Sequence, residues 1–271
     1  MFVPRKYIAG ALLLFATTLC AGGAQATTVI GTLQSVGTGD TITLHTTNTQ
    51  GTSIGAQVLT GLETFTRASG AAGGTDTSTL AGGPGGFLAF CIEPFEDASL
   101  GATYTYTVAP LASGDNSSIP GGIGSLKATQ ISELFGQYLP SFSTPIGATQ
   151  AAALQVAIWE IVSELPSNPF DVLHGNTYFT TPGSDDTTAM LNLAQGYLNY
   201  VSSANGNGPL AQGLTALTVN GNQDMLVQVV SAAPEPGTWM MMILGFGLVG
   251  NAMRALRGRG ARRQPALAFA G

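Results

Sequence analysis

Positive charge is nearly absent from the central part of this 271-residue chain. Between residues 27 and 233, Arg67 and Lys127 are the only Lys or Arg residues, against fourteen Asp and Glu residues, so this body has a formal net charge of −12. The whole-chain value of −6 hides the excess, because the other seven Lys and Arg residues lie near the two ends. A body that cannot form a basic patch cannot neutralise phosphates, so we expect no nucleic-acid partner.

Cysteine is also scarce. The chain has Cys20 and Cys91, and Cys20 lies in a segment that we expect to be removed on export. The remaining body would hold Cys91 alone, which excludes an intrachain disulfide. A single thiol in an oxidising compartment is a liability unless it is buried or chemically occupied.

Recognisable catalytic motifs are missing. The sequence has no G-x-S-x-G, H-E-x-x-H, Walker or dinucleotide-binding pattern, and its two histidines, His45 and His174, are more typical of surface or turn positions. We therefore expect no cofactor, no metal site and no enzymatic activity. One alternative stays open, a secreted polysaccharide hydrolase with Glu93, Glu160 and Glu164 as candidate carboxylates, because paired carboxylates cannot be recognised from sequence.

The N-terminus has the features of a secretory signal peptide. Arg5 and Lys6 precede an apolar run at residues 8–19, and Ala24-Gln25-Ala26 forms a small-x-small cleavage site. The apolar run is short for a membrane span, which favours removal over anchoring. We predict a signal peptide at residues 1–26 and a mature chain that begins at Thr27.

The C-terminal region predicts a membrane anchor. Pro234-Glu235-Pro236 precedes an uncharged stretch, and we expect a transmembrane helix at about residues 238–253, short against the usual ~20 residues. Trp239 suits the outer interface, and a basic cluster suits the cytoplasmic side. That cluster consists of Arg254, Arg257, Arg259, Arg262 and Arg263. A plain single-span anchor fits these physical features equally well.

Residues 234–263 resemble the PEP-CTERM sorting tail of Gram-negative bacteria, in its Trp-containing variant. The resemblance rests on Pro234, Glu235, Pro236 and Trp239, a Met-rich Gly-Phe-Gly span and the arginines that follow. It implies processing by an exosortase, inner-membrane anchoring before processing, and then a cell-surface or extracellular-matrix location in an exopolysaccharide or biofilm setting. Residues 264–271 form a short extra tail beyond the family pattern.

The body, residues 27–233, predicts a single α+β domain in which about three helices separate N-terminal from C-terminal antiparallel strands. Alternating polar and apolar residues predict a hairpin, with strands at 28–37 and 40–46 and a turn between them. Further strands are expected at 57–67, 87–93, 103–108, 214–219 and 225–230, and a Gly-rich loop at 68–86. Helical periodicity predicts helices at 126–139, 148–165 and 187–201.

One pair of residues in the body suggests chemistry. Cys91 ends an apolar strand in Phe-Cys-Ile-Glu, and Gln155 lies on the strongest predicted helix, four residues before Trp159 and on the same face. A cysteine thiolate that attacks a glutamine amide expels ammonia and leaves an internal thioester. Such a bond removes the free thiol and stores an electrophile for an amine or hydroxyl. It needs a base, or a lowered thiol pKa, and the sequence offers no obvious base.

Residues 87–165 resemble the thioester domains of Gram-positive surface adhesins. The match rests on Phe90-Cys91 and on Gln155-Val-Ala-Ile-Trp159, with Leu154 where that family has Thr. It implies a Cys91–Gln155 cross-link, supported by Phe90 and Trp159, and an adhesion or attachment role towards extracellular polysaccharide or surface nucleophiles. The other interpretation is an inert matrix protein, with Cys91 a buried structural thiol and Gln155 a polar helix residue.

Overall fold

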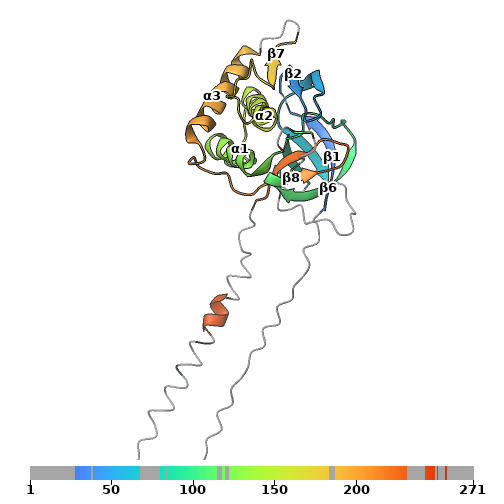
Figure 1. The fold of residues 1–271 in the computed structure, drawn as a ribbon. Helices are drawn as coiled ribbons and strands as arrows, with labels where there is room; N and C mark the ends of the chain where they lie inside the picture. The colour runs from blue at the N-terminus through green and yellow to red at the C-terminus, as the bar shows by residue number, and fades with distance from the viewer. Residues whose placement is uncertain are drawn as a thin grey trace, which may run out of the picture.

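The computed structural model describes residues 28–37, 39–67, 80–82, 85–114, 118–119, 122–182, 187–230, 242–247, 249 and 254. Within these residues the strands gather on one side of the body and three long helices on the other (Figure 1). All strand pairs described are antiparallel. The predicted α+β class, with helices between the early and late strands, is confirmed.

Six strands close into a barrel with its own apolar interior. Their order is β1 (Thr28–Val36), β4 (Glu63–Arg67), β5 (Gly86–Cys91), β9 (Met225–Gln228), β8 (Leu214–Thr218) and β6 (Thr103–Pro110). Alternate side chains point inwards, as the pleat of a strand requires. Phe65 stacks on Phe87 with ring centroids 4.7 Å apart, and Tyr106 meets Phe65 edge-on at 6.0 Å. Gly31 leaves room for these rings, because a Cβ there would lie 2.7 Å from the Phe87 ring.

A second sheet of three strands lies beside the barrel. Its central strand is β2 (Thr41–Thr47), flanked by β3 (Ser53–Leu59) and β7 (Tyr178–Thr180). Ile42 and Leu44 of β2 are fully buried and belong to the core that the helices form, not to the barrel core. The short strand β7 was not predicted from the sequence.

The predicted hairpin at 28–46 is therefore wrong. Both strands exist, but β1 pairs with β4 and β6, whereas β2 pairs with β3 and β7. Val29 and Leu33 bury in the barrel and Ile42 and Leu44 under the helices, so the two strands serve separate cores. Alternation reports that one face is buried, and it does not report which core covers that face.

The predicted strand at 57–67 is two strands in the structure, one in each sheet. Residues up to Leu59 belong to β3, and β4 begins at Glu63, so the chain crosses back to the barrel between them. The two crossings lie side by side, since Gly37 N–H donates to the Leu62 carbonyl and Thr60 N–H to the Asp40 carbonyl. Gly61 has φ +140°, a conformation that favours glycine.

The helices form a layer with one of them at its centre. They are α1 (Gly124–Tyr138), α2 (Ala148–Ser163) and α3 (Thr188–Ala204), preceded by the one-turn helix η2 (Leu111–Ser113). α2 contacts α1, α3 and strand β5, and every residue from Ala151 to Ser163 is buried. All three helices lie within a few residues of their predicted bounds. A central buried helix against a strand end is what positions the candidate site.

Several predicted segments lie outside the described residues. These are the signal peptide at 1–26, most of the Gly-rich loop at 68–86, the Pro-Glu-Pro motif with Trp239, the arginines of the basic cluster other than Arg254, and the extra tail at 264–271. Of the predicted span at about 238–253, only residues 242–247 and 249 are described, and these are helical. No helix in the described ranges is long and apolar enough to cross a membrane.

Candidate functional site

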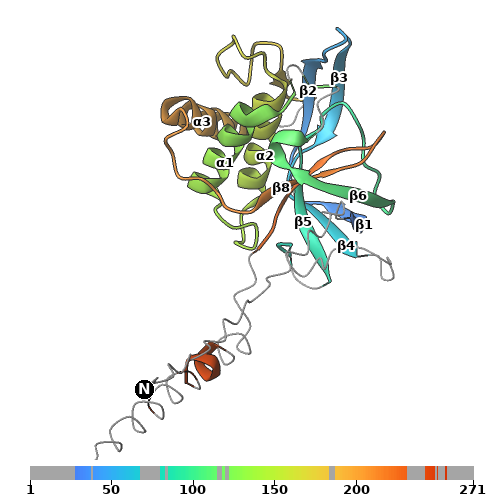
Figure 2. The same cartoon turned by 60° about the horizontal axis from the view of Figure 1, so that its bottom comes forward.

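Cys91 lies where the barrel meets the helical layer. It is the last residue of β5, the barrel strand that contacts α2 (Figure 2). Met225 of β9 is its partner on one side, but the ladder with β4 ends at the pair Glu63 and Ala89, two residues earlier. No β4 residue is therefore available to bond the peptide groups of Cys91, and buried peptide groups need partners.

The side-chain amide of Gln155 takes the place of the missing strand. The Cys91 N–H donates to Gln155 Oε1 at 3.0 Å, and Gln155 Nε2 donates to the Cys91 carbonyl at 2.8 Å. Both residues are 1% exposed. The structure thus brings together two residues that are 64 positions apart in sequence, with the amide held against the backbone of the cysteine.

Trp159 completes the surroundings of the thiol. It lies one helical turn after Gln155 on α2, and its indole Nε1 donates to Cys91 Sγ at 3.2 Å. The thiol itself donates to the Glu93 carbonyl at 3.3 Å. Burial raises the pKa of the Cys91 thiol well above its usual range, the charge of Glu63 adds to that rise, and the Trp159 hydrogen bond opposes it. The thiol is therefore protonated at neutral pH.

This geometry is suited to acyl chemistry at the Gln155 side chain. A nucleophile that adds to Cδ of Gln155 would place negative charge on Oε1, and the Cys91 N–H already points at that oxygen. Preformed N–H donors at a developing oxyanion are the usual means by which proteins favour such additions. Trp159 Nε1 is placed to stabilise a thiolate at Sγ.

Phe90 anchors β5 to the helices. It is fully buried, with ring centroids 5.3 Å from Phe135 of α1 and 5.4 Å from Phe142. Phe90 and Cys91 both belong to the core that the helices form, so the last two residues of β5 are held between the end of the barrel and α2. Leu154, where the adhesin motif has Thr, is fully buried in the same core as Phe90.

Glu63 is the acidic residue of the site that sequence reasoning missed. It is 4% exposed, its Oε2 has no hydrogen-bond partner within the described ranges, and burial raises its pKa to about 8. The hydroxyl of Tyr106, also inside the barrel, is likewise without a partner among the described residues. The alternation of Glu63 with Phe65 in β4 was the signal that could have found it, because it places a carboxylate on an inward face.

The three carboxylates of the hydrolase alternative are buried. Glu93, Glu160 and Glu164 are each at most 2% exposed. Glu164 accepts from the backbone N–H groups of Leu165, Asn176 and Thr177 and from the side chain of Asn168, so it organises the loop after α2. Glu160 accepts from the Asp171 N–H, and burial raises its pKa to about 9. Glu160 and Glu164 thus accept hydrogen bonds from the segment that follows α2.

The two histidines are engaged in local contacts. His45 stacks on Tyr178 with centroids 4.5 Å apart and shares a 2.9 Å hydrogen bond with Thr180, across β2 and β7. His174 forms an exposed pair with Asp171 at 3.0 Å. In the part of the chain that the structure describes, no cluster of three or more His, Cys, Asp or Glu side chains could hold a metal ion.

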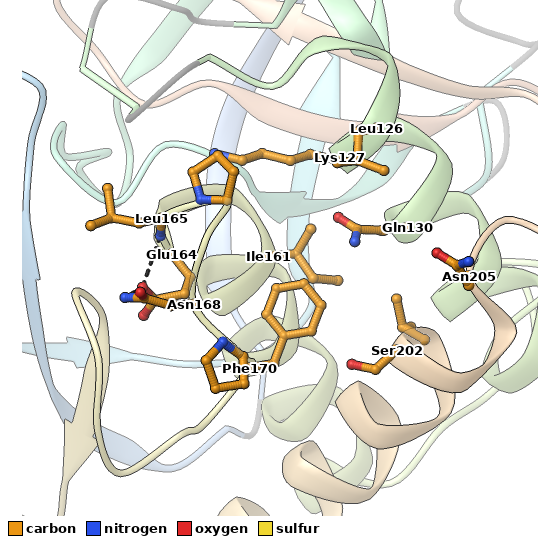
Figure 3. A pocket seen from close by; sticks show the side chains of 13 residues that line it. Leu126, Lys127, Gln130, Ile161, Glu164, Leu165, Asn168, Phe170, Ser202 and Asn205 are labelled. Atoms are coloured by element: carbon orange, nitrogen blue, oxygen red, sulfur yellow. Dashed lines mark hydrogen bonds between the residues drawn. The ribbon is translucent and has the colours of Figure 1, made fainter.

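A cavity of about 190 Å³ lies at the other end of α2 (Figure 3). Ile161 and Phe170 form its apolar wall, and Gln130, Ser202 and Asn205 contribute polar groups from α1 and the end of α3. Cys91, Gln155 and Glu160 do not line it. Of the hydrolase candidates only Glu164 reaches this cavity, which leaves no second carboxylate opposite it.

Residues 232–263 match the family model of the PEP-CTERM protein-sorting motif. This segment is a PEP-CTERM sorting tail. The predicted Pro234-Glu235-Pro236 motif, Trp239 and the basic cluster fall inside the matched range. No curated protein and no solved structure matches the chain.

The PEP-CTERM tail establishes where the body acts. It marks an extracellular protein that is exported, held transiently at the membrane by this tail and processed by an exosortase. The tail also explains the charge asymmetry of the chain, because its arginines lie beyond the acidic body. The buried Cys91–Gln155 site therefore belongs to a domain that functions outside the cytoplasm.

Proposed function

We propose that the exported body attaches covalently to surface or matrix material through an internal thioester between Cys91 and Gln155. The observation that carries the proposal is the double hydrogen bond between the Gln155 amide and the Cys91 backbone, with Trp159 Nε1 on Sγ. These contacts hold the Gln155 amide against the backbone of the residue that carries the thiol. The resemblance to adhesin thioester domains supports the same pair.

The bond changes are simple. Cys91 Sγ adds to Cδ of Gln155, the Cδ–Nε2 bond breaks and ammonia leaves. An amine or hydroxyl of the target then adds to the same carbon, the C–S bond breaks and the thiol returns. The target stays attached through an amide or an ester. Burial of both residues protects the stored electrophile from water until a target arrives.

A second cavity, lined in part by α2, is the entry that we propose for the target. It has a volume of about 450 Å³ and is lined by Leu62, Leu88, Ala148 and Ala151 among others. Ala151 lies one helical turn before Gln155 on α2, so it is the lining residue nearest to Gln155 along the helix. An amine or a sugar hydroxyl that enters here approaches α2 from the barrel side.

Attachment to extracellular polysaccharide or to nucleophiles of neighbouring surfaces would give the protein an adhesion or biofilm-matrix role. The exosortase-processed tail delivers the body outside the cytoplasm. The acidic body would not bind anionic polymers through charge alone, since like charges repel. A covalent bond removes the need for a favourable surface charge.

Intact-mass measurement of the chain from Thr27 onwards, which holds Cys91 as its single cysteine, tests the proposal in detergent solution. We expect a mass one ammonia lighter than the sequence, and a gain of one methylamine after incubation with that amine. The matched controls are Cys91→Ser and Gln155→Glu, which keep the size of each side chain and cannot form the bond by loss of ammonia. An unmodified mass together with one titratable thiol per chain would contradict the proposal and favour an inert matrix protein.

A further inference from the structure

Formation of the proposed thioester needs a base that accepts the proton of the Cys91 thiol. Trp159 Nε1 and the Cys91 N–H are donors. The Glu93 carbonyl accepts the S–H, but a peptide oxygen is far too weak a base to remove that proton. Since burial holds the thiol in its protonated form, a basic group within the barrel end is required.

The register of the barrel places one carboxylate beside the thiol. Glu63 lies opposite Ala89 in the β4–β5 ladder, and Cys91 follows Ala89 by two residues on β5. Residues two apart on a strand share a face, so Glu63 and Cys91 are diagonal neighbours at the end of the barrel where it meets the helical core. Diagonal neighbours of this kind lie roughly 7 Å apart or less at their Cβ atoms. The charge of Glu63 accordingly acts on the Cys91 thiol.

Glu63 has the properties of a reactive group rather than a structural one. It is 4% exposed, and its Oε2 has no hydrogen-bond partner among the described residues. An unpaired buried carboxyl destabilises a fold, so its presence needs an explanation. Glu164 is buried to a similar degree but receives four hydrogen bonds. Glu63 alone of these two has an oxygen available for proton transfer.

We propose that Glu63 is the general base, and then the general acid, that forms the Cys91–Gln155 thioester. The inference rests on the proposed function. The Cys91 S–H proton passes to the Glu63 carboxylate, and Sγ bonds to Cδ while the Cys91 N–H stabilises the charge on Oε1. The Cδ–Nε2 bond then breaks, and the departing nitrogen takes the proton from Glu63 and leaves as ammonia. The carboxylate returns to its starting state.

The surroundings of Glu63 set the pH at which it can act. The charge of Glu63 acts on Cys91 of β5 and on Tyr106 of β6. Glu93 also acts on Cys91, and Tyr104 and Asp224 act on Tyr106, so these groups surround the same end of the barrel. β1 contributes apolar inward residues, and Arg67 lies at the far end of β4. Burial raises the pKa of Glu63 to about 8, close to the optimum for a base that works near neutral pH.

The test uses the reverse reaction to reset the site in the same folded chain. Incubation with ¹⁵N-labelled ammonium returns the thioester to a thiol and a labelled Gln155. After removal of the ammonium, loss of labelled ammonia is followed by intact mass between pH 6 and pH 9. We expect the wild-type rate to rise towards a plateau near pH 8. In Glu63→Gln we expect a rate about 100-fold lower with no such rise, and in Glu63→Asp a partial recovery.

Glu160→Gln is the matched control, because Glu160 is also buried with a raised pKa but does not act on the Cys91 thiol. Its rate should equal that of the wild type, and thermal unfolding should show that all variants are folded. A wild-type chain that forms the thioester, together with Glu63→Gln that forms it at the same rate and pH profile, would overturn this inference alone. A wild-type chain without the mass deficit would overturn the proposed function as well.

Discussion

The barrel end and the loop after α2 both bury a carboxylate, and they treat it in opposite ways. At the loop, Glu164 accepts three backbone N–H groups and one side-chain amide. At the barrel end, Glu63 has an oxygen without a partner within the described ranges and a pKa raised to about 8 by burial. The first arrangement stabilises a fold, whereas the second destabilises it and leaves the group able to exchange a proton.

Gln155 and Glu164 show the same contrast between the two regions. Gln155, in the middle of α2, bonds a strand end that carries a thiol, whereas Glu164, the residue that follows α2, bonds the backbone of the loop after it. Degree of burial does not separate the two regions, since both side chains are almost wholly enclosed. What separates them is whether the buried polar atoms are satisfied, and whether the neighbour is a nucleophile.

A large effect on stability is expected at the loop. Glu164→Ala removes a charged acceptor from four donors, and hydrogen bonds to charged groups contribute roughly 1.5–3 kcal/mol each. We expect the unfolding free energy, measured by urea denaturation, to fall by about 4 kcal/mol, with the Cys91–Gln155 site unchanged in any protein that still folds. A loss below about 1 kcal/mol would mean that Glu164 does not organise this loop.

Stability at the barrel end should depend on pH in the opposite sense from an ordinary salt-bridged carboxylate. The pKa of Glu63 rises from 4.5 to about 8 on folding, so between these values the folded state binds more protons than the unfolded state. Stability therefore falls as pH increases from about 4.5 to 8, by about 1.4 kcal/mol per unit of pKa shift. Glu160, with a pKa of about 9, adds a similar fall.

Glu63→Gln should remove the part of this pH-dependent stability loss that comes from Glu63. The variant should therefore be more stable than wild type above pH 8 by a few kcal/mol. The measurement is urea denaturation at pH 5, 7 and 9, with Glu160→Gln as the companion that removes the other share. Parallel profiles for wild type and Glu63→Gln would show that the carboxyl is not protonated by burial, and would remove the physical basis of the comparison.

An intermediate effect is expected from Trp159→Phe. The change deletes the indole N–H that lies 3.2 Å from Sγ and leaves a smaller ring in the core. We expect a stability loss of about 2 kcal/mol and a higher pKa of the Cys91 thiol, because the hydrogen bond from Trp159 lowers that pKa. Alkylation of the thiol, measured against pH in a Gln155→Glu background, reports that pKa. Phe135→Leu, a buried aromatic change away from Sγ, should leave the alkylation profile unaltered.

The helices and the later strands could be predicted because each rests on a local signal, whereas the proximity of Cys91 and Gln155 was expected from the resemblance to adhesin thioester domains. Apolar residues at helical spacing placed α2, and Pro166 marked its end. The connections could not be predicted, because β1 and β2 show the same alternation although they bury in different cores. Only the crossing at residues 37–40, which pairs with residues 60–62, decides between a hairpin and two sheets.

Glu63 illustrates the same limit at the site. Its place on β4 is visible as alternation, but its proximity to Cys91 depends on the β4–β5 register, and the loop between those strands is long and Gly-rich. A connection of this length in sequence carries no register information, unlike a two-residue turn. The thiol and the amide could be recognised from motifs, whereas the carboxylate that faces them needed the three-dimensional structure.

The smallest expected effect tests access to the site rather than its chemistry. Ala151→Val adds two methyl groups to the lining of the 450 Å³ cavity, one turn before Gln155. We expect the thioester to form as in wild type, since Gln155 and Cys91 keep their contacts. Reaction with methylamine should be little changed, and reaction with a bulky amine such as an amino sugar should slow several-fold. Equal slowing for both amines would indicate a displaced helix, and no slowing for either would place the entry route elsewhere, so the ratio of the two rates separates access from reactivity.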